Sequence, residues 1–129
     1  MYGNPVTAYE NVSNMTMSGR EIEAAVLSKA ARKLKACQEN WNNGDGEKKL
    51  EDALKFNQRI WSIFQSELVR DDNPMPKNLR LDILRLSNFI DRRILETMAY
   101  PSPEKLDIII SINNNLAAGL RSSQLDADV

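Results

Sequence analysis

The sequence predicts an all-α fold, a single-domain bundle of about four amphipathic helices with a mostly extended N-terminal arm. Three observations lead to this prediction. Apolar residues recur at steps of three and four over long segments. Short stretches rich in Gly, Pro and Asn separate those segments, and no stretch alternates at period two over the length of a strand. A chain of 129 residues has the size of one domain and can bury a core without help from disulfides or bound metal ions.

The chain is expected to begin with an arm at residues 1–17, followed by a helix that starts near Ser18. The arm contains Pro5 and small polar residues and shows no helical period. Ser18 and Glu21 have the capping-box spacing, in which a hydroxyl and a carboxylate satisfy backbone N–H groups at the start of a helix. One apolar face follows, made of Ile22, Val26, Ala30, Leu34, Cys37 and Trp41.

The other three helices are bounded by residues that interrupt helices. The interruptions are NNGDG at 42–46, RDDNPMP at 70–76 and YPSP at 100–103. The helices are expected over about 47–68, 77–98 and 103–119. Ser102 can cap the last helix, with Pro103 at its first position. The helical domain is thus expected at 18–120, with a disordered tail at 121–129.

Composition argues against an enzyme, a metal site and a nucleic-acid-binding protein. The chain has no histidine, the commonest general acid–base and zinc ligand, and no glycine-rich phosphate loop. The net charge is −1 with interleaved signs, which gives no dense positive field for nucleic acid. No apolar run approaches the roughly 20 residues of a membrane span. The N-terminus has no signal-peptide pattern, and the single cysteine, Cys37, permits no internal disulfide. We expect a cytoplasmic, non-enzymatic protein without cofactors.

The helix at 47–68 carries more apolar surface than one packing partner needs. Its main stripe includes Asn57, Trp61 and Phe64, and a second apolar row beside it includes Ile60. A tryptophan on such a stripe is usually part of the core. The excess has two explanations that the sequence leaves open. Either other helices surround this helix, or it offers a groove to another chain.

The last helix shows a similar excess, and both helices have an asparagine on the apolar stripe. A buried amide without partners costs about 1–3 kcal/mol. Each amide is therefore expected to bond within the protein, to the other amide or to a carbonyl, or to meet a partner chain. The candidate partner-binding residues are Asn57, Ile60, Trp61, Phe64, Ile108, Ile112 and Asn113.

The order and spacing of these segments resemble the FlaF family of flagellar biosynthesis regulators, over about residues 8–120. The most specific part is Ala53-Leu54-x-x-Asn57-x-x-x-Trp61-x-x-Phe64, followed by Asn73-Pro74 and Pro76. The pairs Ile112-Asn113 and Gly119-Leu120 also fit, and Ser62 stands where a threonine is expected.

The resemblance implies a small cytoplasmic helical protein that binds flagellin, at an amphipathic terminal segment. Such a protein would be a chaperone for flagellin export through the flagellar type III apparatus and would promote filament assembly. FlbT, a regulator of flagellin translation, and flagellar export components are further candidate partners. Two alternatives stay open: a post-transcriptional regulator acting through FlbT or flagellin mRNA, and a structural homo-oligomer or adaptor.

Overall fold

The computed structural model describes residues 19–128, with side chains described as far as Ser122. Its elements are α2 (Gly19–Glu39), α3 (Gly46–Leu68), α4 (Lys77–Ala99), the 3-10 helix η1 (Pro103–Lys105) and α5 (Leu106–Asp128). These helices confirm the predicted all-α bundle, and this range contains no strand. The expected arm at 1–17 and the expected cap at Ser18 lie outside the described residues.

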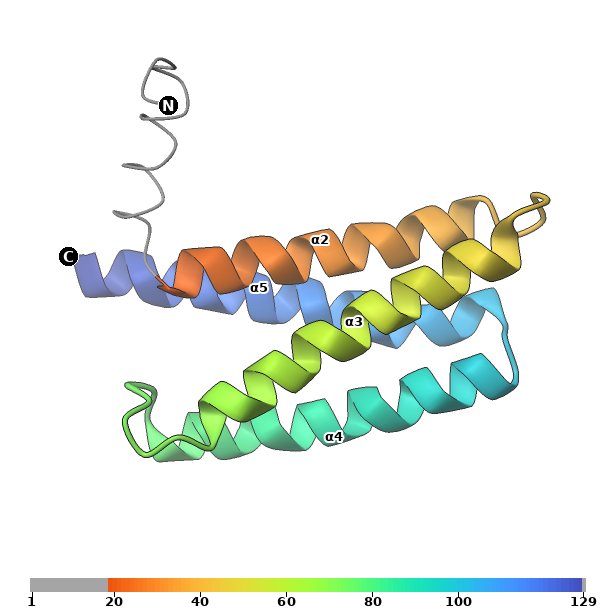
Figure 1. Cartoon of the computed structure of the whole chain (residues 1–129). Coiled ribbons are helices and arrows are strands. Elements are labelled where there is room, and N and C mark those ends of the chain that lie inside the picture. Colours follow the sequence, from red (N-terminus) through yellow and green to blue (C-terminus); the bar gives the residue numbers. More distant parts are fainter. Residues whose placement is uncertain (1–18, 129) are drawn as a thin grey trace, which may run out of the picture.

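Helices α2 and α5 form one antiparallel pair, and α3 and α4 form a second pair that packs on the first through α3 (Figure 1). Helices α2 and α5 lie side by side and make the most extensive helix–helix contact. Helix α3 crosses them diagonally, and α4 runs antiparallel to α3. Helix α4 packs mainly against α3 and touches α5 only weakly. Thus α3 has neighbours on several sides, whereas α4 has one main neighbour.

Two side chains tie distant parts of the bundle together. The Gln38 Nε2 atom donates hydrogen bonds to Pro103 O at 2.8 Å and to Asp107 Oδ1 at 2.6 Å, which joins α2 to η1 and α5. The Gln65 Nε2 atom donates to Asp91 Oδ2 at 2.9 Å, which joins α3 to α4. These bonds lie at the margins of an apolar interior. The fully buried apolar side chains include Ala24, Leu27, Ala30, Leu34, Trp61, Ile90, Ile94, Leu106, Ile109 and Ala117.

The turn between α3 and α4 is held by side chains that satisfy the last carbonyl groups of α3. Asn73 Nδ2 donates to Glu67 O at 3.0 Å, and Asn73 Oδ1 accepts a bond from Met75 N at 2.9 Å. Arg80 Nη1 donates to Arg70 O at 3.0 Å and to Leu68 O at 3.4 Å. Carbonyl groups at the end of a helix lack intrahelical partners. The asparagine and arginine therefore fix the angle at which α4 returns along α3.

The beginning and the end of the last helix differ from expectation. Ser102 is extended and makes no side-chain cap hydrogen bond, and η1 intervenes before α5. Helix α5 does not stop near Gly119 but continues through Asp128, over most of the expected tail. Gly119 does not have the positive φ of a helix-terminating glycine. No proline follows it, and Leu120, one position on, is buried on the helical face.

Gly46, the first residue of α3, lies against the preceding turn. A Cβ atom added there would be 2.9 Å from Trp41 O, whereas one added at Gly119 would meet nothing within 4 Å. We expect Gly46→Ala to lower the free energy of unfolding by about 1–3 kcal/mol, because a backbone carbonyl must move. Gly119→Ala should raise the free energy of unfolding by about 0.5–1 kcal/mol, since Gly119 lies in a helix interior. Urea unfolding followed by circular dichroism checks both; equal effects of the two substitutions would contradict this expectation.

Candidate functional site

Three of the predicted site residues form a buried hydrogen-bond network between α3 and α5. The Asn113 Nδ2 atom donates to Asn57 Oδ1 at 2.6 Å, and Trp61 Nε1 donates to Asn113 Oδ1 at 3.0 Å. Asn57 Nδ2 donates in turn to Ala53 O at 2.9 Å and to Ala30 O at 3.2 Å, which extends the network to α2. The two amides therefore satisfy each other and two helix carbonyl groups, one of the arrangements that the sequence left open.

The network lies inside the protein and offers no surface to a partner in this conformation. Asn57, Trp61 and Asn113 are each 0% exposed. Phe64 is 8% exposed and packs edge-on against Trp61, with ring centroids 5.9 Å apart. The tryptophan therefore has the core position that its stripe favours. A role of these four side chains in binding would require the bundle to open.

Helix α2 lies against Phe56, which is four positions before Ile60 on α3. The Lys29 and Lys33 ammonium groups lie 5.6 Å and 5.0 Å from the centroid of the Phe56 ring, a geometry that permits cation–π attraction. Ile60 is half-buried against the core, and Ile63 is 54% exposed. The wide apolar circumference of α3 thus follows mainly from its place among the other helices. Contact of Ile60 with a partner stays a prediction.

The two predicted isoleucines of α5 lie nearer the surface than Asn113. Ile108 is 38% exposed, and Ile112 is partly buried against the core. They are four residues apart and so share one face of the helix. Ile60, by contrast, lies between Asn57 and Phe56 around α3, and both of these contact α2. The seven predicted residues therefore do not form one continuous surface.

Helix α4 carries exposed apolar side chains, although none of the seven predicted site residues lies on this helix. Its exposed large side chains are Leu79, Leu81, Leu86, Phe89 and Leu95. Leu79, Leu86 and Phe89 have the i, i+7, i+10 spacing of one stripe, and they are 36–42% exposed. We call these three residues the α4 stripe. Leu79 and Leu86 share one apolar stripe of this helix with Ile83 and Ile90, which are buried.

The α4 stripe is exposed because of the position of α4 in the bundle. The helix meets α3 along one side and α5 only weakly. The Arg93 guanidinium lies 5.6 Å from the centroid of the Phe89 ring, one turn further along the same face of the helix. Apolar side chains aligned in this way are typical of a surface that another chain covers.

Shifted pKa values in the described range have structural causes. Burial raises the pKa of the Cys37 thiol, against the opposing effect of Lys49 and Lys33. Burial also raises the pKa of the Glu23 carboxyl; Arg20 opposes this shift and Glu67 adds to it. Among the described residues, no group of three or more His, Cys, Asp or Glu side chains is placed to hold a metal ion.

Comparison with known proteins places this helical bundle in a family. The family model described as flagellar protein FlaF matches residues 5–120, nearly the whole chain. The chain therefore belongs to the FlaF family and is a flagellar protein. A search of curated proteins and a search of solved structures found no match. Between residues 19 and 128, no helix combines the length and the apolar character that crossing a membrane requires.

Proposed function

We propose that this FlaF-family protein binds an amphipathic terminal segment of flagellin in the cytoplasm, without catalysis, and supports flagellin export and filament assembly. The α4 stripe is the observation that carries the proposal. It presents an apolar row on a helix with one main neighbour, so a client helix can pack beside α4.

The requirements of such a chaperone match the properties of this surface. A client segment that folds only against a partner keeps apolar side chains exposed until they are covered. A helix-in-groove contact covers them by side-chain burial alone and needs no cofactor. Ile108 and Ile112 of α5 remain candidate contact residues, because their side chains are not fully buried. FlbT and the export components remain candidate partners of the same complex.

Binding of flagellin to charge variants of α4 tests the proposal. Size-exclusion chromatography with light scattering should show a one-to-one complex with monomeric flagellin that is lost when one terminal segment of flagellin is deleted. The double variant Leu79→Asp/Leu86→Asp should weaken the affinity at least about tenfold, because it places charges in the contact. Its helical circular dichroism should match that of the wild type, since both side chains are partly exposed.

Leu95→Asp is the matched control for these substitutions. Leu95 lies on α4 and is 58% exposed. It is nine positions after Leu86, which places it on the opposite side of the helix. An equal loss of affinity in Leu95→Asp, or wild-type affinity in the double variant, would contradict the α4 stripe as the contact. A folded protein that binds no flagellin would overturn the proposed function. A stable dimer of the protein alone, dissociated by the double variant, would favour the homo-oligomer instead.

A further inference from the structure

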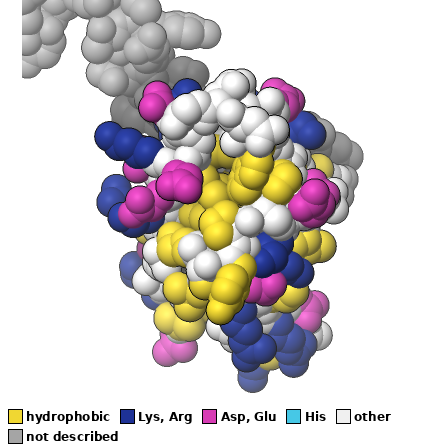
Figure 2. Space-filling model, turned by 90° about the vertical axis from the view of Figure 1, so that its right-hand side faces the viewer, with side chains coloured by type: hydrophobic (Ala, Val, Ile, Leu, Met, Phe, Trp, Pro, Cys, Tyr) yellow, Lys and Arg dark blue, Asp and Glu magenta, His cyan; other side chains and the backbone are white. Residues whose placement is uncertain are grey.

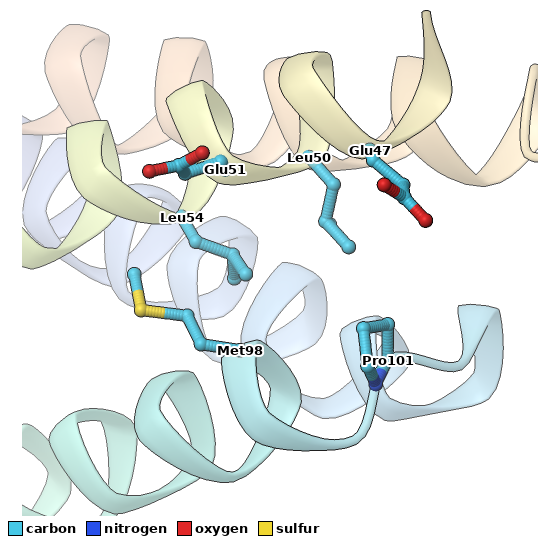
Figure 3. Close-up of a pocket in the computed structure, with 6 residues that line it drawn as sticks. All are labelled: Glu47, Leu50, Glu51, Leu54, Met98 and Pro101. Carbon is cyan, nitrogen blue, oxygen red and sulfur yellow. The ribbon is translucent and has the colours of Figure 1, made fainter. Parts of the chain in front are cut away.

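A second surface feature, separate from the α4 stripe, lies at the end of the bundle where α3 begins and α4 ends. It is a cleft of about 410 Å³ (Figure 3). Its lining residues are Glu47, Leu50, Glu51, Leu54, Met98 and Pro101. An adjoining hollow of about 350 Å³ shares Glu47, Leu50 and Pro101 with it and adds Trp41. The two form one continuous depression across this end of the bundle.

The floor of the cleft is apolar. Leu50 and Leu54 form part of the buried core, while Met98 and Trp41 are partly buried against it. Figure 2 shows hydrophobic side chains gathered on this end of the molecule, with both acidic and basic side chains around them. A methionine side chain is flexible and adapts to the shape of an incoming group. The floor therefore suits one large apolar side chain of another chain.

The α3 side of the cleft is acidic. Glu47 and Glu51 are both exposed and lie four residues apart, on the same face of α3. Two like charges at this spacing slightly destabilise a helix. Lys55 pairs with Glu51 at 2.7 Å, on the turn of α3 that leads away from Glu47.

Glu47 makes no ion pair within residues 19–122, the part of the chain with described side chains. Lys105 Nζ donates to Tyr100 O at 2.6 Å and lies 3.8 Å from Glu96, so this cation has partners beyond the cleft. Glu47 lies in the first turn of α3, where the positive end of the helix dipole stabilises a negative charge. The helix dipole explains why a carboxylate is found at the start of α3. It does not explain why an apolar cleft lies next to Glu47 and Glu51.

We propose that this cleft is a docking site for a basic amphipathic segment of a partner chain. One large apolar side chain of the segment rests against Leu50, Met98 and Pro101. A Lys or Arg one helical turn away meets Glu47, whereas Glu51 is already paired with Lys55. Charge complementarity selects this occupant over an acidic one. The site goes beyond the proposed function, because it provides a second contact that does not use the α4 stripe.

Two synthetic peptides test the proposal without flagellin. One is a fifteen-residue amphipathic helix with Leu and Ile on one face, flanked by Lys; its twin has Glu at every Lys position. Methyl-¹³C methionine labelling of the full chain gives a resonance for Met98, and amide spectra report the Trp41 indole. The basic peptide should shift both signals in a saturable manner. The acidic twin should bind at least about tenfold more weakly, and added salt should reduce the difference.

Charge reversal then assigns the preference to the two carboxylates. The double variant Glu47→Lys/Glu51→Lys should bind the basic peptide at least about tenfold more weakly and should bind the acidic twin more tightly than the wild type does. Asp52→Lys, an exposed acidic position on the same helix that does not line this cleft, should leave the preference unchanged. Equal binding of both peptides, a Met98 signal that does not move, or no binding of the basic peptide would each overturn the proposal. None of these outcomes depends on whether flagellin binds.

Discussion

Trp61→Ala is expected to lower the free energy of unfolding by about 3–5 kcal/mol, the range for removing a large aromatic side chain from a core. The Trp61 side chain is 0% exposed, and its indole N–H is bonded to Asn113. The substitution removes the apolar contacts, including the edge contact with Phe64, and leaves Asn113 Oδ1 without its donor. Small domains have a total stability of about 5–15 kcal/mol, so this loss is a large fraction of it.

Urea unfolding followed by circular dichroism measures this loss, and two variants separate its causes. Trp61→Phe keeps most of the ring and removes the N–H donor, so we expect a smaller destabilisation than for Trp61→Ala. Ile63→Ala, two positions away on α3, changes a side chain that is 54% exposed and should stay within about 0.5 kcal/mol of the wild type. A Trp61→Ala protein with wild-type stability and weakened flagellin binding would show that the tryptophan acts at a surface.

Asn57→Ala is expected to destabilise the protein by at least about 1–3 kcal/mol, the cost of leaving a buried polar group unsatisfied. The substitution removes the acceptor that Asn113 Nδ2 uses at 2.6 Å, inside a site that excludes solvent. It also removes the hydrogen bond that Asn57 Nδ2 donates to Ala30 O, which links α3 to α2. Helicity at low urea should be retained, with the unfolding midpoint shifted to lower urea.

A double-mutant cycle that combines Asn57→Ala with Asn113→Ala measures the interaction free energy between the two asparagines. Either single substitution removes the bond from Asn113 Nδ2 to Asn57 Oδ1 and leaves one buried polar atom unsatisfied. The double variant should therefore lose less stability than the sum of the losses in the two single variants, by about 0.5–3 kcal/mol. Ser87→Ala is a matched control, since Ser87 is equally buried but bonds only to Leu84 O within its own helix. We expect it to cost less than Asn57→Ala. Unchanged stability in Asn57→Ala together with weakened binding would instead assign the asparagine to a partner contact.

Helical periodicity was sufficient to predict the number of helices and their boundaries in the range 19–118. The period of apolar residues and the interrupting residues are local properties, and they located α2, α3 and α4 to within a few residues. The end of α5 was not predictable in the same way. Gly119 is compatible with both a helix end and a helix interior, and the contact between α2 and α5 is a tertiary property that the local pattern does not contain.

The site was only partly predictable, for a related reason. Periodicity shows which residues share a face but not which other element covers that face. Trp61 and Leu86 both lie on apolar stripes, yet the first is fully buried and the second is 36% exposed, because α3 is surrounded and α4 is not. The partners of Asn57 and Asn113 were left open because the two residues are 56 positions apart in sequence. Only the packed structure brings them together.

The pairing of α2 with α5 determines when the bundle can form during synthesis. The ribosome makes α2 first and α5 last among the described helices, yet these two share the most extensive contact. Until α5 has emerged, the nascent chain holds an incomplete bundle in which the α5-facing side of α2 is uncovered. Contacts between such distant segments also slow folding relative to bundles closed by neighbouring helices. The complete bundle can therefore form only after α5 has been translated.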